Sequence, residues 1–165
     1  MYEQFSVRVY NIAIGYMQNS NDAEEVTQDV FTSVFRNAIK FKGDSNVGTW
    51  IYRITVNTSL NHINKRKRNV SVDLGEKEIV QPDFNHPGVI LENKENARYL
   101  FGAIDKLPKN QKTAFILSYI DDLPRQIVAD TMEMSLKAIE SLLQRGKKNL
   151  RDELRKMYPN RRKKK

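Results

Sequence analysis

The stretch NDAEEVTQDVF at residues 21–31 opens a segment whose apolar residues recur at intervals of three and four. This spacing predicts an amphipathic α-helix over residues 22–40, because it places the apolar side chains along one stripe. Asn21 and Glu24 have the spacing of a capping box, in which each side chain bonds a free backbone N–H at a helix start. The side chains predicted to be buried are Val26, Val30, Val34, Phe35 and Ala38.

Another face of this predicted helix carries Glu25, Gln28, Asp29 and Thr32. The face is acidic, although 28 basic and 20 acidic residues give the whole chain a net charge of +8. Because phosphates repel carboxylates, the face suits a basic protein partner better than DNA. An ordinary solvated helix face has the same pattern, so the pattern alone leaves both readings open.

Helical periodicity extends along the chain on both sides of this segment, and no alternating pattern indicates strands. Glycine, proline and acidic residues concentrate between about residues 69 and 90, which is typical of a linker. The sequence therefore predicts an all-α protein of two small helical bundles joined by a flexible acidic linker. Helices are expected over residues 3–18, 22–40, 49–67, 93–105, 109–120, 124–131 and 135–157.

The net charge differs between the two segments with helical periodicity and the linker that separates them. Residues 1–68 carry a net charge of +3, residues 69–96 carry −4, and residues 97–165 carry +9. Two basic blocks around an acidic spacer suit a protein that contacts a polyanion twice, although a generic basic protein has the same balance.

No apolar run is long enough to span a membrane and no signal peptide opens the chain, so we expect a cytoplasmic protein. With no cysteine and only two histidines, His62 and His86, we expect neither metal nor disulfide.

The predicted helix over residues 49–67 has a polar face suited to nucleic acid. Its buried stripe is predicted to contain Val56, Leu60 and Ile63. Amide and guanidinium groups can bond base edges or phosphates, and aromatic rings such as those of Trp50 and Tyr52 can stack on unpaired bases. Trp50 taken alone is better explained as a core residue. The polar side chains follow one another four residues apart: Arg53, Asn57, Asn61 and Lys65.

Residues 124–131, a break at 132–134 and a helix capped by Ser135 have the spacing of a helix-turn-helix, although the usual turn glycine is absent. The second helix is predicted to bury Ile139, Leu143 and Leu150. Such a helix can read the major groove of DNA, although similar helix pairs occur in proteins that never bind DNA. The side chains predicted to be exposed are Lys137, Glu140, Ser141, Gln144, Arg145, Lys147 and Lys148.

Taken together, these segments resemble the extracytoplasmic-function (ECF) sigma factors of bacterial RNA polymerase. The resemblance rests on residues 21–31, on FKGDS at 41–45, on TWIYRITVN at 49–57, and on LPKNQ at 107–111 with RGKKNL at 145–150. It covers about residues 1–68 and 97–156. Ala138 and Leu142 depart from it, because many relatives carry threonine and arginine there, so the base preference of relatives does not transfer.

The resemblance implies a protein that is not an enzyme and needs no cofactor. It implies family regions 2 and 4 over residues 1–68 and 97–158, with a linker at 69–96 and a basic tail at 159–165. The expected partners are core RNA polymerase, promoter DNA and an anti-sigma factor, with no small-molecule substrate. The function implied is promoter-specific initiation of transcription. A stand-alone helix-turn-helix regulator is the alternative, and a small helical enzyme acting on nucleic acid is a weaker one, because no paired carboxylates or metal cluster is evident.

The resemblance also assigns roles to the polar faces. The polymerase-binding residues would be Asp22, Glu25, Gln28, Asp29 and Thr32. Contacts to the minus-10 element would come from Lys42, Gly43, Asp44, Ser45, Trp50, Arg53, Asn57, Asn61 and Lys65. Contacts to the minus-35 element would come from Ser135, Lys137, Glu140, Ser141, Gln144, Arg145 and Lys148.

Overall fold

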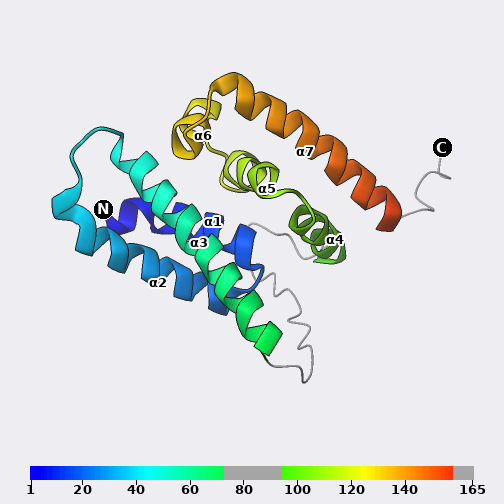
Figure 1. The fold of residues 1–165 in the computed structure, drawn as a ribbon, viewed down its shortest axis with the longest axis horizontal. Helices are drawn as coiled ribbons and strands as arrows, with labels where there is room; N and C mark the ends of the chain where they lie inside the picture. Colours follow the sequence, from blue (N-terminus) through cyan, green and yellow to red (C-terminus); the bar gives the residue numbers. More distant parts are fainter. Residues whose placement is uncertain (73–93, 158–165) are drawn as a thin grey trace.

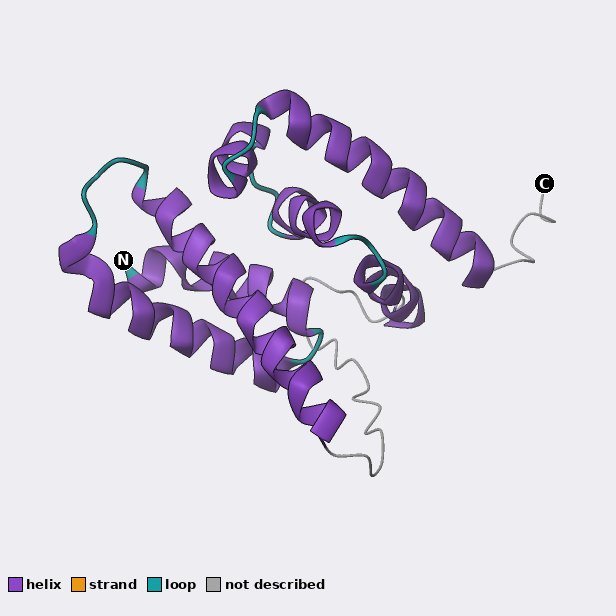
Figure 2. Ribbon diagram, in the orientation of Figure 1, coloured by secondary structure: helices purple, strands orange, loops and turns teal. Residues whose placement is uncertain are grey.

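A computed structural model describes residues 1–72 and 94–157 of the chain, and every secondary-structure element within them is helical (Figure 2). The predicted all-α fold of two bundles is confirmed. The first bundle contains α1 (Tyr2–Met17), α2 (Ser20–Asn37), the short 3-10 helix η1 (Ala38–Lys40) and α3 (Val47–Val72). The second contains α4 (Lys94–Asp105), α5 (Lys109–Phe115), the π-helical turn η3 (Ile116–Ile120), α6 (Arg125–Met132) and α7 (Leu136–Met157).

Helices α3 and α4 extend into the range predicted as linker, since α3 continues through Val72 and α4 begins at Lys94. The rest of the predicted linker, residues 73–93, and the basic tail lie outside the described residues. The segment predicted as one α-helix over residues 109–120 contains two kinds of helix. It is α-helical in α5 and becomes π-helical in the turn η3.

The start of α2 differs from the prediction. The helix begins at Ser20, and its N-cap is Asn19 rather than Asn21. The Asn19 Oδ1 atom accepts a hydrogen bond from the backbone N–H of Asp22 at 2.8 Å, and Asn19 Nδ2 donates to Asp22 Oδ2 at 2.8 Å. This pairing satisfies a backbone donor that no earlier helical turn can satisfy.

The core of the first bundle forms where α1, α2 and α3 meet. Val9, Ile12 and Tyr16 of α1 are buried, and α2 contributes Ala23, Val26, Val30 and Val34. The predicted burial of Phe35 and Ala38 is wrong: Phe35 is 83% exposed and Ala38 is also exposed. One residue further along a helix is a rotation of about 100°, so Phe35 points away from the face on which Val34 is buried.

The buried side of α3 also differs from the prediction. The predicted side chains are not the buried ones: the residues of α3 that are buried instead include Ile51, Tyr52, Thr55 and Ser59. The Thr55 hydroxyl donates to the carbonyl oxygen of Ile51 at 2.8 Å, which satisfies its polar group inside the core. The predicted stripe of Val56, Leu60 and Ile63 is only half-buried, and it packs on the edge of the core.

The second bundle encloses its own apolar residues, among them Ile104, Leu117, Val128 and Ile139, none of which is exposed. Its α6 and α7 form the predicted helix-turn-helix. The turn between them passes through Glu133 at φ 54°, a left-handed conformation that glycine adopts most easily. The backbone therefore makes the expected turn although a side chain is present at this position.

The two bundles lie side by side and pack directly against each other (Figure 1). Helix α1 contacts the turn η3, and helix α3 contacts α6. The buried apolar side chains of both bundles belong to one continuous cluster. The linker pattern predicted separate modules, and this contact between them was not foreseen.

Candidate functional site

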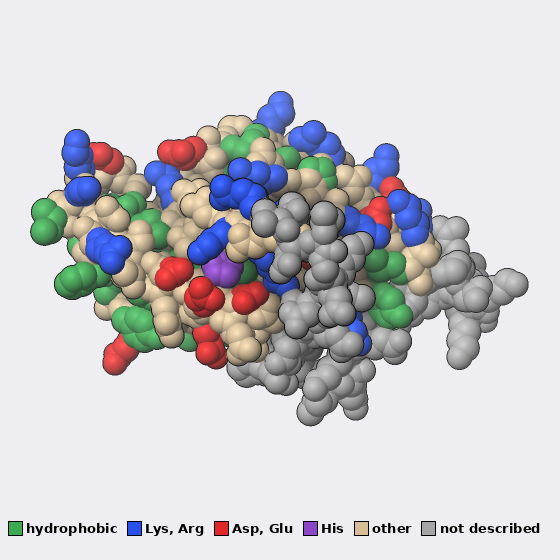
Figure 3. Space-filling model, turned by 60° about the horizontal axis from the view of Figure 1, so that its bottom comes forward, with side chains coloured by type: hydrophobic (Ala, Val, Ile, Leu, Met, Phe, Trp, Pro, Cys, Tyr) green, Lys and Arg blue, Asp and Glu red, His purple; other side chains and the backbone are tan. Residues whose placement is uncertain are grey.

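The acidic face of α2 is open to solvent. Glu25, Gln28, Asp29 and Thr32 are all exposed, as the helical spacing predicts. Asp22, the fifth residue assigned to this surface, is half-buried and has structural partners, because its carboxylate holds the Asn19 cap and pairs with Arg66 of α3 at 3.1 Å. The Glu25 carboxylate lies 3.4 Å from the imidazole of His62. Figure 3 shows acidic side chains gathered beside this histidine.

The same face continues into two large apolar side chains that sequence reasoning missed. Phe35 is 83% exposed and Ile39 is 98% exposed. Gln28, Thr32, Phe35 and Ile39 are spaced by four, three and four residues, which places them along one side of α2 and its short extension η1. We call Glu25, Gln28, Asp29, Thr32, Phe35 and Ile39 the α2 docking face. Large apolar groups in such a position are typical of a protein-binding surface.

The loop between η1 and α3 presents the first group of predicted DNA contacts. Lys42, Gly43 and Asp44 are exposed and Ser45 is half-buried. Gly43 has φ 74°, a backbone conformation that side chains disfavour, so this tight loop depends on glycine. The Trp50 ring is half-buried against the ring of Phe41, with centroids 4.9 Å apart.

Of the four residues predicted to form the polar face of α3, three are exposed to solvent and one forms bonds with the second bundle. Asn57, Asn61 and Lys65 are exposed. The Arg53 guanidinium instead bonds the second bundle: Nη2 donates to the carbonyl oxygen of Asp130 at 2.6 Å, and Nη1 lies 3.5 Å from Glu133 Oε1. An open crevice of about 400 Å³ separates this part of α3 from the helix-turn-helix. Its lining includes Arg53, Val56, Asn57, Leu60 and residues 131–134.

Helix α7 presents the polar face that was predicted from the sequence. Ser135 caps the helix, since its Oγ accepts from the backbone N–H of Ala138 at 3.1 Å. Leu142, the position where many relatives carry arginine, is buried at 6% exposure and contributes to the core. The exposed side chains are Lys137, Glu140, Ser141, Gln144, Arg145, Lys147 and Lys148.

An aromatic and cationic cluster beside α7 was not identified from the sequence. The Tyr119 ring lies 4.9 Å from the Arg125 guanidinium and 4.9 Å from the Lys147 ammonium, and Arg125 donates to the Tyr119 hydroxyl at 3.0 Å. A hydrogen bond with Lys147 lowers the pKa of Tyr119. The cluster joins η3, α6 and α7, so only the tertiary structure brings its members together.

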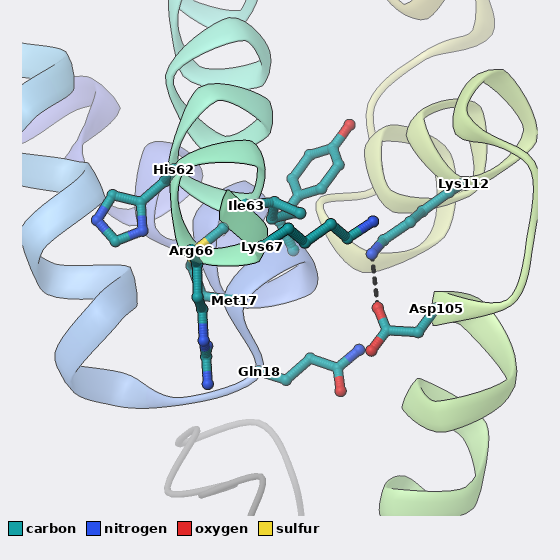
Figure 4. A pocket seen from close by; sticks show the side chains of 9 residues that line it. Met17, Gln18, His62, Ile63, Arg66, Lys67, Asp105 and Lys112 are labelled. Carbon is teal, nitrogen blue, oxygen red and sulfur yellow. Dashed lines mark hydrogen bonds and ion pairs between the residues drawn. The ribbon is translucent and has the colours of Figure 1, made fainter. Parts of the chain in front are cut away.

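A second crevice, of about 370 Å³, follows the seam between the bundles (Figure 4). Its lining includes cations from both bundles, and two of them are paired with carboxylates: Arg66 with Asp22, and Lys112 with Asp105.

Among residues 1–72 and 94–157, no group of three or more His, Cys, Asp or Glu side chains is arranged to hold a metal ion. Within the same residues, no helix has the length and apolar character needed to cross a membrane.

Two models of one protein family match the two bundles. The model for sigma-70 region 2 matches residues 1–69, and the model for sigma-70 region 4 matches residues 97–150. The chain belongs to the sigma-70 family of RNA polymerase sigma factors, within its ECF class. This confirms the resemblance drawn from the sequence motifs.

Individual relatives agree with this assignment. The chain is 31% identical to the ECF RNA polymerase sigma factor SigE of Mycolicibacterium smegmatis over 93% of its own length, and it spans 60% of that relative. It is 25% identical to the ECF sigma factor SigW of Bacillus subtilis, covering 90% of this chain and 83% of that one.

Solved structures share the fold. The sigma factor RpoE in complex with the anti-sigma factor NepR, from Bartonella quintana, aligns with a TM-score of 0.73 at 19% identity and covers 93% of this chain and 94% of that one. CnrH in complex with the cytosolic domain of CnrY aligns with a TM-score of 0.65 at 16% identity, covering 92% of this chain and 82% of CnrH.

Proposed function

We propose that this protein binds core RNA polymerase and directs it to particular promoters, where it initiates transcription without catalysing a covalent step itself. It acts where the polymerase acts, in the cytoplasm. The observation that carries this proposal is the match of the two bundles to two different regions, 2 and 4, of one sigma family. We assign region 2 to residues 1–68 and region 4 to residues 97–158, with 69–96 as the linker and 159–165 as a basic tail.

The α2 docking face is the proposed contact to polymerase. Interfaces between proteins commonly have an apolar centre that excludes water and a polar rim that sets orientation. Phe35 and Ile39 supply large apolar groups, and Glu25, Gln28 and Asp29 supply the charged and amide groups beside them. Asp22 fixes the position of this face, because its ion pair with Arg66 holds the start of α2 against α3.

The two DNA-binding surfaces act on different parts of the promoter. The loop residues Lys42 to Ser45, with the polar face of α3, hold the minus-10 element, where an unpaired base stacks or bonds. The exposed face of α7 reads the minus-35 element in the major groove. The cations held around Tyr119 lie beside that helix and suit contact with a DNA phosphate.

An anti-sigma factor is a further proposed partner. Both solved structures named above are complexes: a sigma factor with an anti-sigma factor in the first case, and CnrH with the cytosolic domain of CnrY in the second.

Reconstitution tests the proposal. Purified protein added to sigma-free core polymerase is expected to yield transcripts that start at specific promoters, with none from core polymerase alone. The double change Gln28→Ala, Asp29→Ala is expected to weaken the core complex, while Asp152→Ala on α7 leaves it unchanged. Tight operator binding without polymerase, together with no promoter-dependent transcript, would instead establish the stand-alone regulator.

A further inference from the structure

Helix α7 carries one acidic side chain on its exposed cationic face. The helix has three acidic residues, Glu140, Asp152 and Glu153. Asp152 pairs with Arg155 at 3.6 Å, and Glu153 pairs with Lys156 at 2.7 Å. Among residues 1–72 and 94–157, no cation lies within ion-pair distance of the exposed Glu140 carboxylate and no donor bonds it. This carboxylate is therefore available to a ligand.

Glu140 lies on the side of α7 that faces away from the core. The adjacent Ile139 and the following Leu143 are buried, whereas Glu140 and Gln144 are exposed. Glu140 is the fifth residue of α7. In a helix-turn-helix, the first turns of the second helix are the part that reaches base edges in the major groove. The position of Glu140 is therefore one at which bases are read.

Two cations next to the same side of α7 suit contact with the DNA backbone. Lys147 lies seven residues after Glu140, which is two helical turns along one side of the helix. The Lys147 ammonium and the Arg125 guanidinium each lie 4.9 Å from the Tyr119 ring. Phosphate contacts set the position of a protein on DNA, and base contacts specify the sequence. With a phosphate at Arg125 and Lys147, the earlier turns of α7, including Glu140, are left to meet the bases.

The chemistry of a carboxylate limits which base it can meet. A carboxylate repels phosphates, and it only accepts hydrogen bonds, so it needs a donor from the DNA. In the major groove, guanine presents two acceptors, and thymine presents an acceptor and a methyl group. Adenine presents an amino donor, but its N7 acceptor lies beside that donor and repels a carboxylate. Cytosine presents its N4 amino donor without such an acceptor, so its edge fits Glu140 best.

We propose that Glu140 determines specificity at one position of the minus-35 element, where it selects cytosine by accepting a hydrogen bond from the N4 amino group. The inference rests on the proposed function, since it treats α7 as the helix that enters the major groove. Repulsion from the phosphates offsets part of this hydrogen bond. The carboxylate therefore acts more by rejecting the other bases than by raising affinity.

Gln144 provides an internal reference for this assignment. It lies one turn after Glu140, about 6 Å further along the helix, whereas successive base pairs are about 3.4 Å apart. The two side chains therefore meet different base pairs. Replacing each of them should alter the base preference at its own position and leave the other position unchanged.

Base substitution in a recognised promoter tests the proposal. Transcripts made from genomic DNA of the source organism by core polymerase and the full chain first identify a promoter that the wild type uses. Each base pair of its minus-35 element is then replaced in turn by the other three, and binding of the reconstituted holoenzyme is measured. The wild type should favour cytosine at one position by roughly tenfold over the other bases.

The variants predict distinct changes at that position. Glu140→Gln should shift the preference from cytosine to adenine, because an amide bonds both N6 and N7 of adenine. Glu140→Ala should bind the four bases there nearly equally. Gln144→Ala should alter a different position. Asp152→Ala, which removes an acid that is paired with Arg155, should alter none. Circular dichroism checks that each variant is folded.

Three results would overturn the assignment of Glu140. The first is a Glu140→Gln protein with the wild-type preference at every position. The second is a change in affinity of the same size for all bases, which would show that the carboxylate acts only through its charge. The third is a wild-type preference for another base at the position that responds to Glu140. Absence of promoter-dependent transcripts with the wild-type protein would instead count against the proposed function.

Discussion

Asn19 and Asp22 bond each other reciprocally at the start of α2: Asn19 Oδ1 accepts from the Asp22 backbone N–H, and Asn19 Nδ2 donates to the Asp22 carboxylate, both at 2.8 Å. The same carboxylate reaches Arg66 of α3. The Asn19–Asp22 bonds set where α2 begins, and the ion pair with Arg66 holds this end of α2 against α3. Together they fix the position of the α2 docking face in the first bundle.

Loss of this cap is expected to destabilise the protein. Asn19→Ala should lower the free energy of unfolding by about 1 kcal/mol, because a backbone donor at the helix start loses its acceptor. Asn21→Ala, at the exposed position that the sequence pattern favoured, is expected to have little effect. Urea denaturation followed by circular dichroism measures both, and equal losses would argue against Asn19 as the cap.

Phe35→Ala should separate binding from stability. Phe35 is 83% exposed, so its truncation leaves thermal stability nearly unchanged but is expected to weaken the complex with core polymerase by roughly tenfold or more, as for an apolar hot spot. Val34→Ala, which removes a side chain that is 3% exposed, is expected to lower stability instead. Fluorescence anisotropy with labelled protein measures affinity. A Phe35→Ala protein with normal affinity would remove Phe35 from the docking face.

Asp122→Gly is expected to stabilise the chain. Asp122 is exposed and has φ 51°, a conformation that costs less for glycine. The gain should be roughly 0.5–1 kcal/mol, which raises the unfolding temperature by about 1–4 °C for a chain of this size. Asp122→Ala removes the same charge and keeps the Cβ atom, so it should not give this gain. Calorimetry distinguishes the backbone effect from a charge effect.

Stability is expected to depend on pH through Asp121. Burial raises the pKa of its carboxyl to about 6, although hydrogen bonds from Asn11 and the charge of Arg8 act in the opposite direction. Asp122 is the other charged neighbour, and the Tyr52 hydroxyl lies in the same field. Because the folded protein holds this proton more tightly than the unfolded chain does, the stabilisation is complete below about pH 4 and is lost as the pH rises through about 6.

Comparison with Asp121→Asn isolates this titration. The wild type should gain stability relative to the variant as the pH falls from about 7.5 to 5, since only the wild type binds a proton at this site in that range. Denaturation midpoints at several pH values give the difference. A difference that stays constant across the range would show that Asp121 does not titrate there.

Burial within the helices could be foreseen only in part. The pattern correctly identified Val26 and Val30 as core, because both lie on the side of α2 that packs against its neighbouring helices. It misjudged Phe35, which is exposed although its neighbour Val34 is buried, because the two residues point to different sides of α2. Apolar character and spacing describe one helix at a time, whereas burial requires a neighbouring helix at that position.

The predicted minus-10 face shows the same limit. The spacing of Arg53, Asn57, Asn61 and Lys65 placed them on one side of a helix, and the structure agrees. The spacing contained no information that α6 would approach this side, because the contact joins residues 77 positions apart in the chain. The roles of these residues in DNA binding stay predictions.

The order of the helices, the helix-turn-helix and the sigma-70 motifs were determined by the amino-acid sequence alone, because local periodicity, turn residues and short motifs are properties of neighbouring residues. Only the tertiary structure decided that Phe35 and Ile39 extend the docking face and that Arg53 bonds the second bundle. These features depend on which surfaces meet, and packing between distant segments decides that.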